Sequence, residues 1–436
     1  MPNIDLHIRN LKELFILFFC LICFPIQAAN DTRGDLENAT EEGISGNPSV
    51  ANLDIGTGKL GKAMGFTEDS GVRVGALVIQ DYSYLIDGGV SPHKGGLNSV
   101  LMLGLNLDTG KLKLWKDGLF CLTLLQFNGR PVNNYAGAIQ GYDSLYALNP
   151  LDRFEVYQLW FRQDLFNNKL IIRIGKMVTS YDFGNVLRPY AFREKDLNIP
   201  ATTGLTYNSV FINSTALGTQ PGFYNSAYGI TVTYCPTDSC YLSYGGYDGN
   251  LARRKNTGMR GPQFNGYYYH IGEAGCGWVV KKLPGNLSIG GWYQSGKLET
   301  TTLVKERGAS GLYLFGTQRL WRRRPGVDNS GIVAFIQMGI NKSKTQPMNQ
   351  FLSGGLTFFG LVPCRNDDSF GLGASWAKLN KRIFARPSEI MYQIYYQMFL
   401  WEDVYFTTSL NYIPDPGAGP DVPAATAITG RLIAIF

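Results

Sequence analysis

Apolar residues recur at every second position in many segments of this chain and alternate with polar residues or glycine. Successive side chains of a β-strand point to opposite faces of a sheet, so this period of two predicts strands with one apolar and one polar face. Turn residues such as Asp117-Gly118 and Pro284-Gly285-Asn286 lie between the segments. The clearest alternating segments are 72–84, 101–107, 170–174, 228–234, 312–320, 332–340 and 390–400.

Short turns alternate with long Gly- and Asn-rich stretches such as residues 178–225, which is typical of outer-membrane barrels. A soluble sandwich or propeller would share the periodicity, but many of these strands exceed the roughly five to six residues usual in soluble sheets. At about 25 residues per strand and connection, the chain accommodates about 16 strands. We therefore predict an all-β fold over residues 70–436, a transmembrane antiparallel β-barrel with short periplasmic turns and long outer loops. The barrel must be closed because an open sheet edge cannot lie in hydrocarbon.

The N-terminus has the features of an export signal. Arg9 and Lys12 lie in a polar start, and an apolar block, Leu14–Ile26, leads to a small-residue cleavage site at Ala28. The block is too short to anchor the chain in a bilayer. We predict that residues 1–28 are a signal peptide. Residues 29–69 show no sustained periodicity and are expected to form a flexible or loosely docked periplasmic segment.

The chain ends in the amphipathic segment AATAITGRLIAIF. Ile428, Leu432 and Phe436 share one face of this predicted strand, and Arg431 lies on the other. A terminal aromatic residue on such a strand resembles the assembly signal of bacterial outer-membrane barrels. Together with the export signal, it predicts a protein of the bacterial outer membrane, with lipid and the barrel-assembly machinery as partners.

Composition and cysteine spacing narrow the class further. The chain has 17% charged residues, whereas an average soluble domain has about 25%. Its net charge of +6 is weak and dispersed, which argues against a nucleic-acid partner. No cysteine spacing matches a metal site. A hairpin at Pro236–Ser239 would place Cys235 and Cys240 opposite one another and allow a disulfide; two free thiols at a turn are the alternative.

Several segments carry a family resemblance. The run Arg153–Phe161, followed by LIIRIGKMVTSYDF, resembles the Leu-Tyr-Glu-Leu-Trp to Leu-Arg-Val-Gly-Lys region of carbohydrate-selective porins of the OprB type. The resemblance implies a 16-stranded barrel that passes glucose and related sugars by diffusion. The basic stretch Arg322–Arg324 and the cysteines after the signal depart from the family's pattern, so the resemblance does not fix the sugar. Further similar segments, in the family's order, are Phe211–Gly218, Cys240–Asn250, Leu283–Lys297 and Ser310–Gly326.

If the alternating apolar residues face lipid, the polar residues between them face an aqueous lumen. Guanidinium, amide and carboxylate groups match the paired hydroxyls of sugars, but the contacts must stay weak because a tightly bound solute would not leave. Arg173 and Arg319 are candidates for a constriction because each lies near the middle of a strand. The predicted lumen residues are Arg73, Asp81, Asn106, Gln126, Arg173, Arg319, Gln337, Gln393, Gln397 and Arg431.

Two further groups of residues have more than one interpretation. For the triplet Arg322–Arg324 there are three interpretations: contact with lipid head groups, attraction of anionic solutes to one opening of the pore, or a solvated turn. A set of tryptophans forms either a stacking path for sugar or, as is commoner near strand ends, an interfacial girdle. These tryptophans are Trp115, Trp160, Trp292, Trp321, Trp376 and Trp401.

The predicted function is passive diffusion of carbohydrates, of the glucose-like monosaccharide class, without a cofactor, a metal or a chemical step. A general or anion-preferring porin is the alternative. An enzyme within the barrel wall and a secreted sugar-binding β protein are disfavoured. After the signal the sequence retains only His93 and His270, and it lacks a G-x-S-x-G nucleophile motif. A monomer and a homotrimer both remain open.

Overall fold

The computed structural model describes residues 56–145, 152–184, 219, 221–222, 225–253, 255, 258–300, 303–325, 327–328 and 330–436. The predicted signal peptide, residues 1–28, lies outside the described residues, as do residues 29–55 of the segment after it. Within the described ranges, no helix has both the length and the apolar character needed to cross a membrane.

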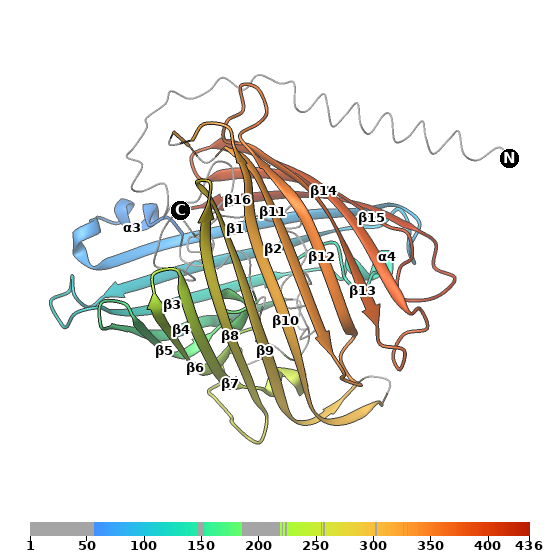
Figure 1. The fold of residues 1–436 in the computed structure, drawn as a ribbon, viewed down its shortest axis with the longest axis horizontal. Coiled ribbons are helices and arrows are strands. Elements are labelled where there is room, and N and C mark those ends of the chain that lie inside the picture. The colour runs from blue at the N-terminus through green and yellow to red at the C-terminus, as the bar shows by residue number, and fades with distance from the viewer. Residues whose placement is uncertain are drawn as a thin grey trace. The chain divides into compact units, whose positions relative to one another are not determined.

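In the described residues, sixteen strands form a closed antiparallel barrel in which each strand pairs with its neighbours in sequence (Figure 1). The first strand, β1 (Val72–Asp87), pairs with the last, β16 (Ala425–Ile435), and this seam closes the ring. The predicted all-β barrel is therefore confirmed. The strands between them are β2 (Gly95–Asp108), β3 (Gly118–Asn128), β4 (Arg153–Leu165), β5 (Leu170–Met177), β6 (Ala227–Thr237), β7 (Cys240–Asp248), β8 (Tyr268–Val280), β9 (Leu283–Glu299), β10 (Lys305–Arg322), β11 (Gly331–Asn341), β12 (Met348–Phe359), β13 (Ser369–Leu379), β14 (Ser388–Trp401) and β15 (Val404–Ile413). The short helices are α3 (Lys59–Ala63), η1 (Glu68–Ser70), α4 (Asn133–Ala136), α5 (Thr179–Asp182) and η5 (Asn250–Arg253).

The two faces of the sheet differ as the alternation predicts. On the outer face, Leu101 and Leu103 of β2 are 43% and 42% exposed. On the inner face, Asp81 and Ser83 of β1 are fully buried. Residues that are paired across neighbouring strands lie on the same face of the sheet. The strand register therefore continues the outer and inner faces from each strand to the next around the barrel. An apolar outer face is what a bilayer requires of a barrel.

The two ends of the barrel differ in their connections. At one end, residues 166–169, 238–239, 281–282 and 402–403 form tight turns between strands. At the other end, the chain between β3 and β4, between β5 and β6, and between β7 and β8 is much longer. Since short turns are periplasmic in outer-membrane barrels, the first is the periplasmic end and the second is the outer end.

The described N-terminal residues 56–70 are attached beside the seam, at the periplasmic end. The backbone N–H of Thr57 donates to the carbonyl oxygen of Phe436 at 3.0 Å. Lys59 of α3 forms an ion pair with Glu402, in the turn between β14 and β15, at 2.9 Å. This part of the predicted periplasmic segment is therefore docked on the barrel.

The disulfide joins Cys240 to Cys276, and the predicted pairing of Cys235 with Cys240 is wrong. Cys240 and Cys276 lie directly opposite each other on β7 and β8, with their Cα atoms 4.2 Å apart. The register of β6 and β7 shifts between Tyr234 and Thr237. The buried Cys235 continues the inward positions Thr231 and Thr233 of β6, whereas Cys240 shares the outer face with the exposed Cys276. The sulfurs of the predicted pair thus face opposite sides of the sheet.

Digestion of the oxidised protein without reduction should therefore yield a crosslinked peptide that contains Cys240 and Cys276, detected by mass spectrometry. Cys235 should be alkylated once the protein is unfolded. The crosslinked peptide should disappear in a Cys276→Ser variant. A peptide in which Cys235 is bonded to Cys240 in the unmodified protein would contradict the register described above.

Candidate functional site: the lumen and its inward loop

Part of the chain between β3 and β4 folds back against the inner wall; residues 130–145 are termed the inward loop. Asn133 organises this loop. Its Oδ1 accepts from the backbone N–H groups of Tyr142 and Asp143, and its Nδ2 donates to the carbonyl oxygen of Asp143, each at 2.9 Å. Gly141 has a φ of +73°, and a Cβ there would lie 2.8 Å from the Asn133 side chain, so this tight turn requires glycine.

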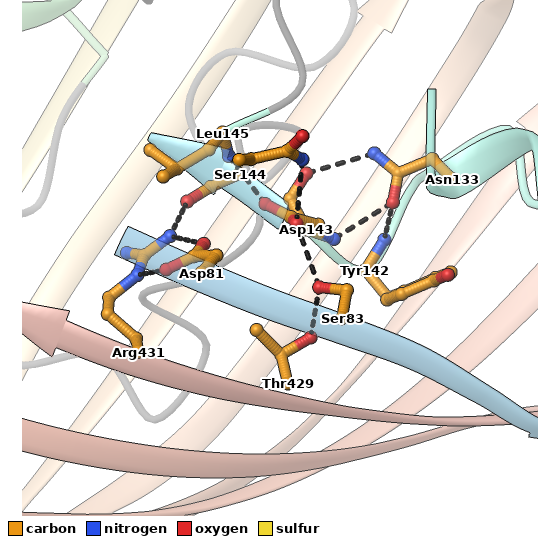
Figure 2. Close-up of polar contacts among 10 residues, drawn as sticks. Asp81, Ser83, Asn133, Tyr142, Asp143, Ser144, Leu145, Thr429 and Arg431 are labelled. Carbon is orange, nitrogen blue, oxygen red and sulfur yellow. Dashed lines mark hydrogen bonds and ion pairs between the residues drawn. The ribbon is translucent and has the colours of Figure 1, made fainter. Parts of the chain in front are cut away.

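Asp143 fastens the inward loop to the wall (Figure 2). Its Oδ2 accepts from Ser83 Oγ of β1 at 2.8 Å and from Asn98 Nδ2 of β2 at 3.0 Å, and its Oδ1 accepts from Leu145 N at 2.7 Å. Ser83 Oγ lies 2.7 Å from Thr429 Oγ1 of β16. Hydrogen bonds to a carboxylate are among the stronger ones, so this attachment fixes the loop.

A buried ion pair at the seam forms the second attachment. Arg431 of β16 donates from Nε and Nη2 to the two carboxylate oxygens of Asp81 on β1, at 2.7 and 2.5 Å. The same Nη2 donates to Ser144 Oγ of the inward loop at 2.7 Å. The two-point geometry offsets part of the cost of desolvating both charges, and removal of either partner would leave the other buried without a counter-charge.

Glu389 of β14 forms the third attachment, on another side of the loop. Its carboxylate accepts from the backbone N–H groups of Ile139 and Gln140 at 2.9 and 2.8 Å. It also accepts from Gly417 N, between β15 and β16, at 2.6 Å. The Gln140 side chain accepts from Ser375 Oγ of β13 at 2.6 Å. One buried carboxylate therefore positions two connections of the outer end.

Aromatic rings line the inner face farther around the ring. Tyr247 of β7, Tyr269 of β8 and Trp292 of β9 are each less than 4% exposed. Their ring centroids are 6.5 Å apart between Tyr247 and Tyr269, and 6.4 Å apart between Tyr269 and Trp292. This aromatic row lies on strands that are far around the barrel from the seam.

Charged groups accompany the aromatic row. The guanidinium carbon of Arg173 on β5 lies 4.9 Å from the centroid of the inward-facing Trp160 ring. Arg173 also forms an ion pair with Asp182 of α5. The charge of Arg173 is thus balanced by a carboxylate and supported by a ring face.

Glu273 of β8 is a lumen residue that sequence reasoning missed. Its carboxylate accepts from the hydroxyl groups of Tyr241 and Tyr313 and from Gly184 N, each at 2.7 Å. The available signal was its place in the alternation of β8, where Ile271, two residues before it, also faces inward.

The structure places the predicted lumen residues as follows. Asn106 of β2 is half-buried and on the inner side of the register. Arg73, which pairs with it, lies at the periplasmic end of β1, where its exposed guanidinium donates to the carbonyl oxygen of Gly56 at 2.8 Å. The residues that are buried on the inner face are Asp81, Arg173, Arg319, Gln337, Gln393, Gln397 and Arg431.

Gln126 is the exception, because it is exposed on the outer face. It pairs with the exposed Leu101, while its neighbours Leu125 and Phe127 are fully buried inside. For β3 the predicted orientation is therefore wrong: the polar Gln126 faces outward and the neighbouring apolar residues face inward. Leu125 and Phe127 pack in one apolar cluster with Leu145 of the inward loop, so apolar residues face inward where that loop covers the wall.

The tryptophans divide between the two interpretations. Trp160 and Trp292 face the lumen. The triplet Arg322–Arg324 lies at the periplasmic end, where Arg324 pairs with Asp328 and Arg323 donates to Gly360 O at 2.6 Å. The tryptophans outside the lumen are Trp115, Trp321, Trp376 and Trp401.

One part of the inner wall carries polar atoms without a protein partner. Among the described residues, both amide atoms of Gln337 and the hydroxyl groups of Thr317, Ser353 and Ser409 are buried and make no hydrogen bond. Such atoms need water or a solute as partner. In the same residues no group of His, Cys, Asp or Glu is arranged to hold a metal ion.

A closed barrel with an apolar outer face, a polar inner wall and a loop fixed within it defines a porin of the bacterial outer membrane. The chain belongs to the family described as carbohydrate-selective porin, OprB family, whose profile matches residues 94–433. Porin B of Pseudomonas aeruginosa is 20% identical over 406 residues, which cover 80% of this chain and 84% of that protein.

Two solved structures support the fold. The high-pH structure of Pseudomonas putida OprB has a TM-score of 0.75 at 18% identity and covers 87% of this chain and 98% of its own. The low-pH structure of the same protein has a TM-score of 0.57 at 17% identity, with 87% and 97% covered. The barrel of this chain thus has the OprB architecture.

An Asp143→Ala substitution should loosen the inward loop. It leaves the buried Ser83 and Asn98 groups without their acceptor, at a cost of about 1–3 kcal/mol in loop attachment. Single-channel recordings in planar bilayers should show a larger or noisier conductance than for the unmodified protein. The matched control is Asp117→Ala, which removes an exposed carboxylate from the periplasmic end. Equal conductance and noise in both variants would contradict a role for Asp143 in holding the loop.

Proposed function

We propose that the lumen passes small neutral sugars of the glucose-like monosaccharide class by passive diffusion, without a chemical step or a cofactor. The observation that carries the proposal is that the inner wall combines aromatic rings with polar groups that have no protein partner. Buried rings such as Tyr269 and Trp292 lie on β4–β10 together with Arg173 and Glu273, and unpartnered amide and hydroxyl groups such as those of Gln337 and Ser353 lie on β10–β15. The family description, carbohydrate-selective porin, supports sugar as the solute.

The two parts of the wall complement the two kinds of surface on a sugar. Aromatic rings stack on the apolar faces of a pyranose, and the unpartnered amide of Gln337 offers both donors and acceptors to its hydroxyl groups. A sugar hydroxyl replaces a water at these groups with little net change in hydrogen bonding. Binding therefore stays weak enough for the solute to leave.

Charge balance favours a neutral solute over the alternative of an anion-preferring porin. Two inward-facing guanidinium groups are paired with carboxylates, Arg173 with Asp182 and Arg431 with Asp81. Paired charges leave a weaker positive field along the path than free ones would.

The positions of the histidines support a channel without a chemical step. His270 lies on the outer face, where its Nδ1 is 2.7 Å from Tyr244 Oη, and His93 is exposed in the connection between β1 and β2. Neither histidine faces the lumen, so neither is placed to activate a nucleophile there.

The terminal Phe436 supports a further part of the proposal, recognition of the last strand by the barrel-assembly machinery. Its ring is 45% exposed beside the seam. Its backbone bonds to Ala76 through both N–H and carbonyl groups, at 2.8 and 3.0 Å. These bonds to β1 form only when the barrel closes, so the terminal residue is available to a partner until then.

Substitution of Gln337 or Trp292 by Ala should weaken sugar binding in the lumen. Loss of one amide or one ring face should raise the glucose concentration that half-blocks the ion current by about threefold to tenfold. Current noise in planar bilayers with graded glucose measures this concentration. Gln126→Ala is the matched control, because the same side chain there faces outward and the half-blocking concentration should not change. If glucose leaves the current of the unmodified protein unaffected, the sugar part of the proposal is wrong and a general porin remains.

Combined substitution of Arg173 and Arg319 by Ala tests whether these residues belong to a constriction. Both side chains are buried on the inner face, so their removal should widen the path and alter single-channel conductance or sugar block. Heat-modifiable gel mobility checks that the variant still forms a barrel. No change in either electrical quantity would remove both residues from the constriction.

A further inference from the structure

On several strands the outward-facing apolar residues follow one another at every second position; each such series is termed an apolar column. At the outer end of the barrel these columns are followed by a cation. On β11, Met338 and Ile340 are each 46% exposed, and Lys342 follows at the next outward position. The outward columns of β9 and β13 end similarly, at the exposed Lys297 and Lys378. A cation that follows directly on a lipid-facing apolar column lies at the depth of the lipid head groups.

Two polar side chains, the half-buried Glu306 and the buried Asn380, hold three neighbouring hairpins together at this level. Glu306 of β10 accepts from the backbone N–H groups of Lys344 and Thr345, at 2.8 and 3.1 Å. Asn380, after β13, donates to the carbonyl oxygens of Lys344 and Gln346, at 2.8 and 2.9 Å. The connection between β11 and β12 is thereby fixed between its two neighbours. The exposed cations Arg307, Lys381 and Arg382 lie next to these anchors in the sequence, and the exposed Lys344 lies in the connection that the anchors hold.

The arrangement concentrates positive charge. Arg307 and Lys297 are register partners on β10 and β9, and like charges directly opposite each other on one face are unfavourable. The nearby carboxylates are already engaged: Glu299 pairs with Lys305 at 3.3 Å, and Glu306 is used by the hydrogen bonds to the hairpin. An external anion would relieve this repulsion.

The periplasmic end has a different chemistry at the same boundary. Exposed tryptophans stand there, and the indole N–H groups of Trp115 and Trp278 donate to Gln163 and Gln318, at 2.9 and 3.0 Å. The arginine triplet at that end is partly neutralised by Asp328. At the outer end of the barrel, exposed cations such as Lys297, Lys342 and Lys378 take the place of these tryptophans beside the lipid-facing residues.

We propose that these cations bind the phosphate groups of the glycolipid that forms the outer leaflet, lipopolysaccharide, while its acyl chains lie along the apolar columns below. Phosphate oxygens form charge-assisted hydrogen bonds with Lys and Arg and provide the missing negative charge. Lipid is favoured over a free anion because three of the cations, Lys297, Lys342 and Lys378, continue the lipid-facing columns and not the inner wall. The outer rim consists of Lys297, Arg307, Lys342, Lys344, Lys378, Lys381 and Arg382.

The test is a native mass spectrometry titration of the detergent-purified protein with diphosphoryl lipid A and with its dephosphorylated form. The unmodified protein should bind the diphosphoryl form more tightly, and added salt should reduce the difference. A triple variant, Lys297→Gln with Arg307→Gln and Lys344→Gln, should bind it about tenfold or more weakly. The control triple, Lys169→Gln with Lys281→Gln and Lys282→Gln, makes the same charge change at the periplasmic end and should bind as the unmodified protein does.

Two results would overturn the proposal. One is equal binding of the phosphorylated and dephosphorylated lipids by the unmodified protein, which needs no variant to be folded. The other is unchanged lipid A binding by the rim variant together with a shifted reversal potential in a KCl gradient, because the rim would then act on anionic solutes. Heat-modifiable gel mobility verifies that each variant retains the barrel.

Discussion

Every backbone N–H and C=O group that crosses hydrocarbon must be hydrogen-bonded within the protein, and this requirement determines the architecture. It is satisfied here by the pairing of β1 with β16, two strands at opposite ends of the described chain. The lumen depends on the same pairing. Asp81 and Arg431 are register partners at the seam, as are Ser83 and Thr429, and both pairs hold the inward loop. The loop can reach its final attachment only in a closed barrel.

The inward loop is held by polar and apolar contacts in combination. Asp143 and Ser144 make the buried hydrogen bonds, while Tyr142 and Leu145 on either side enter two separate apolar clusters of the wall. The apolar contacts exclude water from the hydrogen bonds, which strengthens them, and the hydrogen bonds select one orientation of the apolar side chains. A loop fixed in this way contributes a constant shape to the lumen.

The alternation of residues predicted the barrel, its approximate strand number and most inward positions. It could do so because every second side chain of a strand faces lipid, and this pattern is visible in neighbouring residues alone. It assigned Gln337, Gln393 and Gln397 to the inner face, where the wall is polar. It failed at Gln126, because the inward loop makes the inner side of β3 apolar and so removes the contrast between the two faces. The predicted Cys235–Cys240 pair failed for a different reason, because Cys235 continues the inward positions of β6 whereas Cys240 lies on the outer face of β7. The position of the inward loop is not encoded in the spacing of nearby residues.

The roles of Asp143, Glu273 and Glu389 were out of reach for a related reason. Each accepts hydrogen bonds from segments that are distant in sequence, as Glu389 does from Gln140. The sequence pattern predicts that such a carboxylate lies at an inward position of a strand or in a long connection. It does not predict which connection folds onto which strand. That choice is made by tertiary packing after closure. The membrane boundary on the outer face is easier to predict from the sequence, because the end of an apolar column is a local pattern. An example is Ile340, which is followed at the next outward position by Lys342. Surface chemistry at the membrane can therefore be inferred from such a chain more directly than the geometry of its lumen.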